Sequence, residues 1–246
     1  MCIVELKSMI QTLNESSLHR TLKNLYALEN DCATEVALDG KIYDIVDANG
    51  NVTEIQTGSV SKLLVKTMNA LQHNRRIKIV YPIAVEKYIT LYDERGIFIS
   101  KRKSPVTHSV YDMFRELTGL YPVLLEKKFS LDVLEITMTE TRVRTPEPVQ
   151  SKNNRRRFCK SWLKQDKQLE KIMAVRTFQN ASDYVRLIPE SCLPEFSARS
   201  IANALKADKS LPASAAKNAH LLLWVLSHMH LIEACGERPR TYRLNV

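Results

Sequence analysis

The stretch KIYDIVDANGNVTEIQTGSVSKLL, residues 41–64, decides the fold of this chain. It holds two β-prone runs around Asn49-Gly50, a residue pair that strongly favours a tight hairpin turn. A carboxylate interrupts each run, Asp44 in the first and Glu54 in the second. These residues belong either to the solvated side of an ordinary hairpin or to a metal site.

The length of the turn determines whether the two carboxylates meet. A two-residue loop, residues 49–50, would place Asp44 opposite Ile55 and on the face away from Glu54. A three-residue loop, residues 48–50, closed by a left-handed glycine, would place Asp44 directly opposite Glu54. Two facing carboxylates in apolar surroundings repel each other unless a cation lies between them. Mg²⁺ suits this position because it accepts one or two carboxylates and completes its shell with water and substrate phosphate.

The neighbouring segments complete an order of six elements. NESSLHRTLKNLYAL, residues 14–28, has Asn14 as a capping residue and leucines at helical spacing. Residues 33–38 form a third β-prone run, and apolar residues at helical spacing predict a second helix over residues 60–72. Residues 76–84 are nearly all apolar, which is typical of a strand buried on both faces. The predicted order is α-β-β-β-α-β.

This order resembles the PD-(D/E)XK nuclease superfamily, the restriction-endonuclease-like fold, over about residues 10–90. In the resemblance, Asp44 stands on the second strand and the triplet Glu54-Ile55-Gln56 on the third. It implies that Asp44 and Glu54 bind a Mg²⁺ or Mn²⁺ ion, with Glu15 on the first helix contributing through water and Glu35 as a further candidate. Taken alone, these residues are also compatible with an ordinary hairpin, and Glu15 with a carboxylate favoured at a helix N-terminus.

The third residue of the triplet departs from the usual pattern of the superfamily. Gln56 stands where the resemblance implies a lysine, and a neutral amide does not offset charge as an ammonium does. Some enzymes of this fold have Gln there and still cut, and in others the lysine has moved to the following helix. Lys62 and Lys66 lie on the polar side of that helix, so we expect Lys62 with Gln56 to complete the catalytic set. The alternative for both lysines is a solvated helix face.

The rest of the chain is predicted to add a second domain. A hairpin, a helix and a long strand extend to residue 145, and residues 146–166, with two prolines and an arginine run, are typical of a basic linker. DKQLEKIMAVRTFQ, SARSIANALKA and PASAAKNAHLLLWVLSHMHLI then predict helices, the second of them capped by Ser197, and two short β-prone runs follow. We therefore expect an α/β (α+β) fold, with a nuclease-like domain over residues 1–145 and a smaller domain over residues 167–246.

The smaller domain resembles a winged helix, a variant of the helix-turn-helix. The resemblance implies that the last helix enters the major groove of DNA and that the basic turn between the final strands contacts phosphates. It assigns DNA contacts to Lys209, Ser214, Lys217, Asn218, Arg238 and Arg240. Winged helices also mediate protein contacts, so a protein-interaction module is an alternative.

The distribution of charge favours a polyanionic partner. The chain carries 36 Lys+Arg and 27 Asp+Glu, a formal net charge of +9. Residues 1–149 hold 19 of each kind, so the whole excess lies in residues 150–246. A basic module beside a neutral one is the asymmetry expected of a nucleic-acid-binding protein, and a basic surface without a specific partner is the alternative.

Composition also argues against several other classes of protein. No apolar run approaches the roughly 20 residues that cross a bilayer, and the first ten residues do not resemble a signal peptide. We therefore expect a cytoplasmic protein without a membrane partner. The five cysteines are scattered without a CxxC pair, which argues against a zinc site or a disulfide framework.

The sequence thus predicts a DNA-binding, Mg²⁺-dependent endonuclease that hydrolyses phosphodiester bonds, with a homodimer as one option for its assembly. In this hypothesis Asp44 and Glu54 bind the ion, and Gln56 with Lys62 orients the attacking water or the scissile phosphate. Two alternatives stay open: a DNA-binding or regulatory protein with a degenerate site, and a winged-helix interaction module on a scaffold domain.

Overall fold

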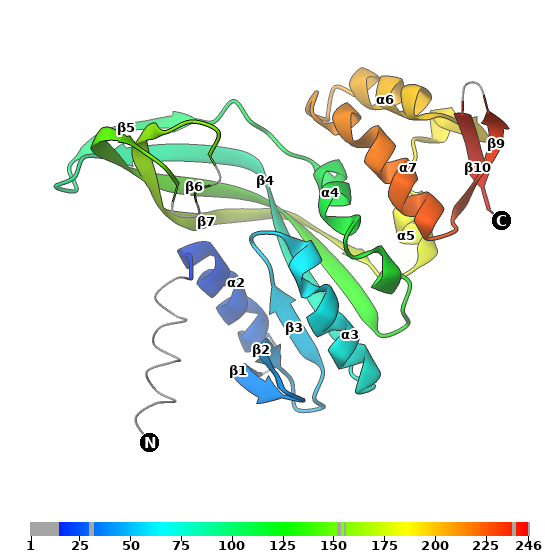
Figure 1. Cartoon of the computed structure of the whole chain (residues 1–246), viewed down its shortest axis with the longest axis horizontal. Coiled ribbons are helices and arrows are strands. Elements are labelled where there is room, and N and C mark those ends of the chain that lie inside the picture. The colour runs from blue at the N-terminus through cyan, green and yellow to red at the C-terminus, as the bar shows by residue number, and fades with distance from the viewer. Residues whose placement is uncertain (1–14, 30–31, 152–153, 155, 238–239, 246) are drawn as a thin grey trace.

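The first part of the chain folds in the predicted order, as the computed structural model shows for its described residues, 15–29, 32–151, 154, 156–237 and 240–245 (Figure 1). The side chain of Ser16 caps the first helix by accepting a hydrogen bond from the N–H of His19, and the predicted cap Asn14 lies outside the described residues. The elements are α2 (Ser17–Leu28), β1 (Ala33–Leu38), β2 (Lys41–Val46), β3 (Val52–Ile55), the 3-10 helix η1 (Val60–Leu63), α3 (Leu64–Gln72) and β4 (Ile77–Tyr92).

One mixed sheet organises most of the molecule. Its strand order is β1-β2-β3-β4-β6-β7, and β5 (Phe98–Lys103) pairs with the outer half of β4. The first three strands form an antiparallel meander, whereas β4 is parallel to both β3 and β6 (Phe129–Val149). β7 (Lys160–Phe178) returns antiparallel to β6. The protein is therefore of the mixed α+β class, as predicted.

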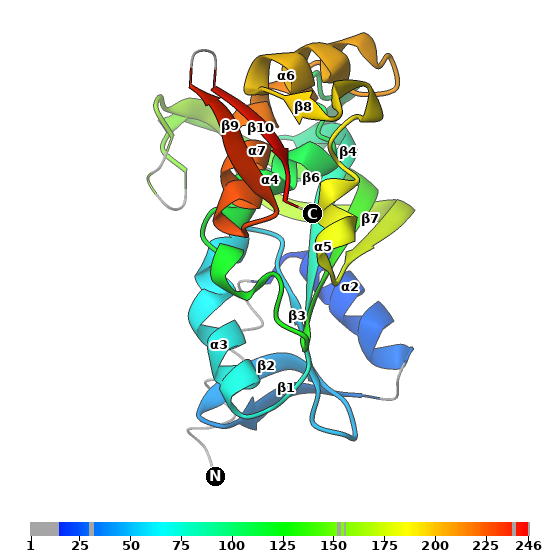
Figure 2. The ribbon, with the colours of Figure 1, turned by 90° about the vertical axis from the view of Figure 1, so that its right-hand side faces the viewer.

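Helices cover the two faces of the central strands, and Figure 2 shows α2 and α3 on opposite sides of them. α2 packs its leucines on a cluster that includes Ile45 and Ile55, whereas α3 and α4 (Phe114–Leu117) cover the face to which Val52 and Ile79 belong. Because side chains alternate along a strand, Glu54 shares the face of Val52. Among the described residues, no helix is both long enough and apolar enough to cross a membrane.

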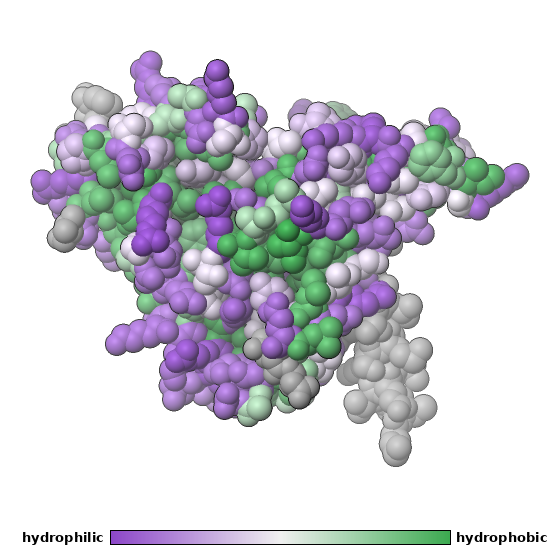
Figure 3. Space-filling view, turned by 180° about the vertical axis from the view of Figure 1, so that it is seen from behind, coloured by the Kyte–Doolittle hydropathy of each residue, from purple (hydrophilic) through white to green (hydrophobic). Residues whose placement is uncertain are grey.

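Residues 146–166 do not form the predicted linker between two domains, because both ends of this segment lie in strands that pair with each other. β6 continues to Val149 and β7 begins at Lys160, and these two residues pair with each other. With β5 and the outer half of β4, these strands form an arm that projects from the rest of the molecule (Figure 1). Ile97 and Phe98 are well exposed near the end of the arm, where Figure 3 shows an apolar area.

The segment DKQLEKIMAVRTFQ is part of β7 and does not form the predicted helix. Its apolar residues Leu169, Ile172 and Val175 are spaced by three, and this spacing mimics a helix. The pairing of β7 with β6 passes over Glu170 and Met173, each of which is an extra residue at a β-bulge. Leu169 and Ile172 therefore both pack against the cluster beneath α2 although they belong to a strand.

The C-terminal part forms a small unit around a three-stranded sheet in the order β8-β10-β9. Its second helix is capped by Ser197, as predicted. The remaining elements of the chain are η2 (Val110–Met113), η3 (Tyr121–Val123), α5 (Ala181–Val185), η4 (Glu190–Cys192), β8 (Glu195–Phe196), α6 (Ala198–Ala207), η5 (Ala215–Asn218), α7 (Ala219–His228), β9 (Ile232–Glu237) and β10 (Arg240–Leu244).

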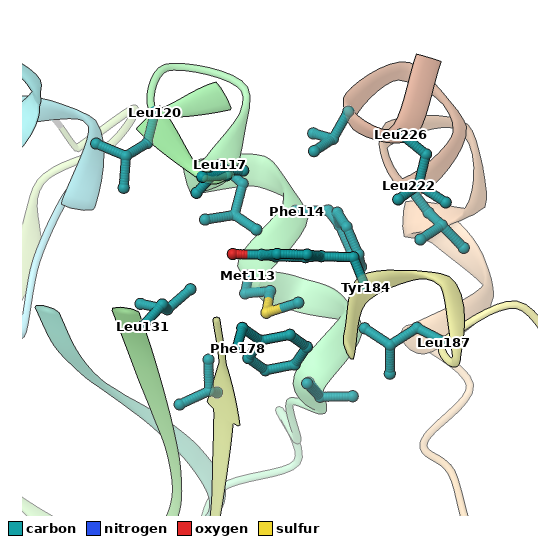
Figure 4. Close-up of a cluster of buried hydrophobic side chains, with 14 of the residues drawn as sticks. Met113, Phe114, Leu117, Leu120, Leu131, Phe178, Tyr184, Leu187, Leu222 and Leu226 are labelled. Atoms are coloured by element: carbon teal, nitrogen blue, oxygen red, sulfur yellow. The ribbon is translucent and has the colours of Figure 1, made fainter. Parts of the chain in front are cut away.

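This unit shares one hydrophobic core with the large sheet. Figure 4 shows Phe114 of α4, Tyr184 of α5 and Leu222 of α7 in a single cluster of side chains. The hydroxyl of Tyr111 donates a hydrogen bond to the main-chain oxygen of Leu187 at 3.0 Å across the same boundary. The two parts are thus packed against each other, and no linker separates them in the described residues.

Candidate functional site

A three-residue loop, residues 48–50, connects β2 to β3. Gly50 adopts a left-handed φ of +72°, and its N–H donates to the main-chain oxygen of Asp47 at 2.9 Å. The register of β2 on β3 then places Asp44 directly opposite Glu54. The two-residue alternative would have turned these side chains to opposite faces, so the turn brings the two carboxylates together.

The two carboxylates join the strands where their regular pairing ends. The N–H of Asp44 donates to Oε1 of Glu54 at 3.0 Å, and the N–H of Ile55 donates to Oδ2 of Asp44 at 2.8 Å. Each carboxylate thus accepts a hydrogen bond from the main chain of the neighbouring strand. These bonds fix both acidic groups at one point between β2 and β3.

Glu54 is buried, with 3% of its surface exposed, and a lysine from α3 pairs with it. Nζ of Lys66 lies 2.6 Å from Oε1 of Glu54 and 5.1 Å from the centre of the Tyr43 ring. Burial and the nearby negative charge of Asp44 raise the pKa of Glu54 to about 7. Glu54 therefore gains and loses a proton near neutral pH, which is a property common at functional sites.

Asp44 pairs with a histidine from α2. Nε2 of His19 lies 3.4 Å from Oδ2 of Asp44, and Nδ1 of the same ring contacts Glu15. Burial opposes ionisation of Asp44, but its hydrogen bonds with His19 and the N–H of Ile55 outweigh burial and hold its pKa below the usual value. Burial also favours the neutral form of His19, yet Asp44 and Glu15 raise its pKa.

Lys23 connects two further predicted acids to this network. Its Nζ lies 2.7 Å from Oε1 of Glu15 and 2.5 Å from Oε1 of Glu35. Glu35 has a φ of +55°, which is uncommon for a residue other than glycine, and it stands where the pairing of β1 with β2 is interrupted opposite Asp44. We refer to five residues as the carboxylate site: Glu15, His19, Asp44, Glu54 and Lys66.

Two predicted members of the catalytic set do not join the carboxylate site. Oε1 of Gln56 accepts a hydrogen bond from the N–H of Gly58 at 3.1 Å, so this side chain shapes the turn after β3. Lys62 lies on η1 and is exposed. The lysine that reaches Glu54 is Lys66, one turn further along, because the α-helical turn that begins at residue 64 carries it to the sheet.

Sequence reasoning missed His19 and Lys23. Both follow Glu15 at intervals of four residues, and side chains four residues apart lie on one face of a helix. That face meets the acidic groups of β1 and β2 in the structure. The four-residue spacing of Glu15, His19 and Lys23 is the signal in the sequence that predicts their position on one face of the helix.

The described residues contain no group of three or more His, Cys, Asp or Glu side chains arranged to hold a metal ion. Mg²⁺ or Mn²⁺ needs fewer protein ligands than that, because one or two carboxylates suffice when water and a substrate phosphate complete the coordination shell. Asp44 and Glu54 fit this requirement: they are hard oxygen donors, and their mutual repulsion contributes to the raised pKa of Glu54. Lys66 and His19 are the side chains with which such an ion would compete for the two carboxylates.

The predicted DNA-binding residues of the C-terminal unit differ in how far they are exposed. Nδ2 of the buried Asn218 donates to Oδ1 of Asp112 at 3.2 Å, and Oγ of Ser214 donates to the main-chain oxygen of Thr107 at 3.0 Å. Asn218 and Ser214 therefore hold η5 against the segment around η2, and burial withdraws the Asn218 side chain from the surface. The other predicted contacts are the exposed Lys209, Lys217 and Arg240, and Arg238, which lies outside the described residues.

Comparisons with known proteins match the sheet-containing part of the chain. The family model described as "Domain of unknown function (DUF8091)" matches residues 16–179, a range that begins beside Glu15 and ends with β7. An "Uncharacterized protein" of Treponema pallidum (strain Nichols) is 32% identical over 127 residues, which make up 52% of this chain and 50% of that relative. The chain thus spans about half the length of the curated relative. No solved structure matches the chain.

Proposed function

The chain belongs to the DUF8091 family, and from the geometry of its carboxylate site we propose that it is a metal-dependent phosphodiesterase that cuts DNA. One observation carries the proposal: Asp44, Glu54 and Lys66 meet where β2 and β3 separate. Two acidic groups and an ammonium at one point form a set suited to binding a divalent ion and a phosphate together.

The order and direction of the elements support the same proposal. From α2 to β4 the chain runs α-β-β-β-α-β, with β4 parallel to β3, and this arrangement resembles the restriction-endonuclease-like fold. Gln56 does not supply the cation that the resemblance implies, and Lys66 on the following helix supplies one 2.6 Å from Glu54. Glu15 lies just before the first turn of α2, within the same network.

The residues of the carboxylate site have distinct parts in the proposed reaction. When bound, Mg²⁺ or Mn²⁺ supplies the polarisation of a water molecule and of the phosphate. Asp44, ionised at neutral pH, and Glu54, once it loses its proton near pH 7, are the groups that hold such an ion. Lys66 carries the positive charge that offsets the phosphate oxygens, and His19 lies between Asp44 and Glu15, which raise the pKa of its ring.

The C-terminal unit has a smaller part in the proposal than the sequence implied. Its helices α6 and α7 and the hairpin of β9 and β10 resemble a winged helix, but the start of its last helix faces the segment around η2. We propose that only Lys209, Lys217 and Arg240 among its described candidates reach DNA, as contacts with phosphates. DNA as the partner and a homodimer as the assembly stay predictions.

A second function has its own supporting observation. Gln56 accepts its hydrogen bond within the turn, and Asp44 and Glu54 are each already paired with a basic side chain of the protein. A degenerate nuclease fold that binds DNA without cutting it would have these features. Both candidate functions include DNA binding, but the second does not include cleavage.

A cleavage assay tests the proposal. Duplex, single-stranded and branched DNA are incubated with the protein and Mg²⁺ or Mn²⁺, and the rates of the wild type, Asp44→Ala and Lys66→Gln are compared. We expect both variants to cut at least ~100-fold more slowly, since each loses a group that acts on the ion or the phosphate. Lys127→Gln, an exposed lysine far along the chain, is the control. Wild-type protein that binds DNA but cuts none of these substrates with either ion would favour the second candidate.

A further inference from the structure

The sheet face beneath α2 changes from apolar to charged where that helix begins. Alternate residues of β6 over 134–138 lie in the core under α2, and the same alternation continues to Glu140 and Arg142. The N–H of Ser17, the first residue of α2, donates to Oδ1 of Asp166 at 2.9 Å. Asp166 pairs with β6 one residue beyond Glu140. Glu140 and Arg142 therefore lie on the same face of β6 as the apolar residues 134–138, but level with the N-terminus of α2, beyond which the helix no longer covers the sheet.

Four basic side chains surround one buried carboxylate at this position. Glu140 is 3% exposed, and Nη2 of Arg142 lies 2.6 Å from its Oε1. Nζ of Lys164 and Nζ of Lys87 lie 3.1 and 3.9 Å from its Oε2. Lys167 stands directly opposite Glu140 on β7. We call Lys87, Arg142, Lys164 and Lys167 the cation cluster. The carboxylate of Glu140 lies among these four basic residues.

The members of the cation cluster repel one another. Burial lowers the pKa of Lys167, and the positive charge of Lys164 lowers it further. Burial also lowers the pKa of Lys87, and the charges of Lys164 and Arg142 act in the same direction against the attraction of Glu140. Glu140 balances only one of these positive charges, so a further anion that binds among them would relieve the remaining repulsion.

The cation cluster adjoins the carboxylate site. Nζ of Lys167 donates to the main-chain oxygen of Thr57 at 3.3 Å, and Thr57 is three residues from Glu54. Toward the arm, two guanidinium groups lie over the ring of Trp162. That of Arg142 is 3.6 Å from the ring centre and that of Arg156 is 4.0 Å from it. Basic groups therefore extend from the carboxylate site along β6 and β7, which pass the first turn of α2 in Figure 1.

We propose that the cation cluster is a phosphate-binding subsite for the nucleic-acid strand that enters the carboxylate site. Contacts with backbone phosphates position a strand without reading its bases, and arginine and lysine are their usual donors. Glu140 holds Arg142 and Lys164 in place and balances part of their charge, so the subsite is ordered before the strand arrives. The inference rests on the proposed function in one respect, that the strand is the substrate of the phosphodiesterase.

Binding of a labelled oligonucleotide, measured by fluorescence anisotropy in EDTA, tests the subsite separately from cleavage. We expect Lys164→Gln to weaken binding ~5-fold or more and to reduce the slope of log affinity against log salt by about 1. Glu140→Gln should tighten binding several-fold, because it removes the negative charge and keeps the shape of the side chain. A variant that merely loses its fold would not bind more tightly. Lys171→Gln, exposed on the same strand, is the matched control and should bind within about twofold of the wild type.

The outcomes separate the two proposals. Equal affinities of the wild type, Lys164→Gln and Glu140→Gln would overturn the subsite, and so would a wild type that binds neither single-stranded nor duplex DNA. Asp44→Ala should stop cleavage and still bind DNA through the cation cluster. Protein that binds through the cluster and cuts nothing would support the subsite and overturn the phosphodiesterase.

Discussion

Glu54, Asp44 and His19 link protonation of the carboxylate site to the stability of the fold. The pKa of Glu54 in the folded protein, about 7, lies above its ordinary value of 4.5, so the folded state holds this proton more tightly than the unfolded chain. The stability that the proton contributes is complete below pH 4.5 and is lost as the pH rises through 7. The raised pKa of His19 acts in the same direction above pH 6.5. The lowered pKa of Asp44 acts oppositely, since its contribution is lost as the pH falls below 3.8.

Replacement of Glu54 by Gln should remove most of this pH dependence. Between pH 5 and pH 8 the free energy of unfolding of the wild type should fall by up to ~3 kcal/mol through Glu54, because one pKa unit corresponds to about 1.4 kcal/mol. Urea unfolding at several pH values measures this difference. Glu29→Gln, exposed after the end of α2, should keep the wild-type behaviour. The same pH dependence in Glu54→Gln and the wild type would contradict the raised pKa.

Lys66 and Lys62 give a second test at the scale of single residues. Lys66 is paired with the buried Glu54, whereas Lys62 is exposed on η1. Lys66→Gln should therefore reduce cleavage ~10-fold or more beyond the effect of Lys62→Gln in parallel assays. It should also shift the pH dependence of the rate to higher pH, because loss of the ammonium raises the pKa of Glu54 further. A larger effect of Lys62→Gln would return the catalytic lysine to the position expected from the sequence.

The hairpin of β2 and β3 is the element on which the site depends. Gly50 has a φ of +72°, and a Cβ added to it would collide with Nη1 of Arg75, a group that also donates to the main-chain oxygen of Gly50. We expect Gly50→Ala to destabilise the protein by ~2 kcal/mol, through backbone strain and because Arg75 must move away and give up its hydrogen bond with Gly50. Gly96→Ala is a matched control, since Gly96 has a φ of +81° but open space around it, and it should lose only ~1 kcal/mol. Thermal unfolding gives both values, and equal losses would exclude a part for Arg75.

A substitution in the contact between η5 and η2 tests whether Asn218 stabilises the fold or contacts DNA. Asn218 is buried and donates to Asp112, so Asn218→Ala removes a buried side-chain amide and leaves the half-buried carboxylate of Asp112 with one partner fewer. We expect a loss of ~1–2 kcal/mol in the free energy of unfolding and no change in DNA affinity. A base-contacting asparagine would show the reverse: weaker binding and unchanged stability. Lys217→Ala, exposed one residue earlier, should leave stability unchanged.

At the scale of the whole molecule, a single core joins the C-terminal unit to the large sheet. The family match ends at residue 179, but the cluster in Figure 4 continues from Phe178 through Tyr184 to Leu226. A division at this boundary would expose the apolar side chains of both parts. The C-terminal unit therefore completes the core of the sheet-containing part.

The shared core predicts that the two parts unfold together. The chain has two tryptophans, Trp162 on β7 and Trp224 on α7, and each reports on one part. Trp162→Phe and Trp224→Phe leave one probe each, and we expect the wild type and both variants to unfold in one transition whose fluorescence and circular dichroism midpoints coincide. Two separate midpoints for the two probes would indicate independent domains.

The sequence by itself determined the order α-β-β-β-α-β, the Ser197 cap and the hairpin around Asn49-Gly50. These features depend on turn chemistry and on the spacing of apolar residues, both of which act over a few neighbouring positions. It also predicted that Asp44 and Glu54 face each other if the loop between their strands has three residues, but it did not decide between two and three. Local information therefore predicted the two carboxylates and offered Lys66 beside Lys62 as a candidate lysine, but it did not predict that His19 joins the site.

Only the tertiary structure decided which groups complete the site and where β7 belongs. His19 and Lys66 reach the carboxylates from two helices on opposite faces of the sheet, and their pairing depends on how those helices pack. β7 looks helical in sequence because its bulges are defined by the partner strand β6, far away in the chain. The burial of Asn218 depends on tertiary packing in the same way, since its partner Asp112 lies 106 residues away. Contacts between distant segments are set by packing of the whole molecule, and no local pattern in the sequence records them.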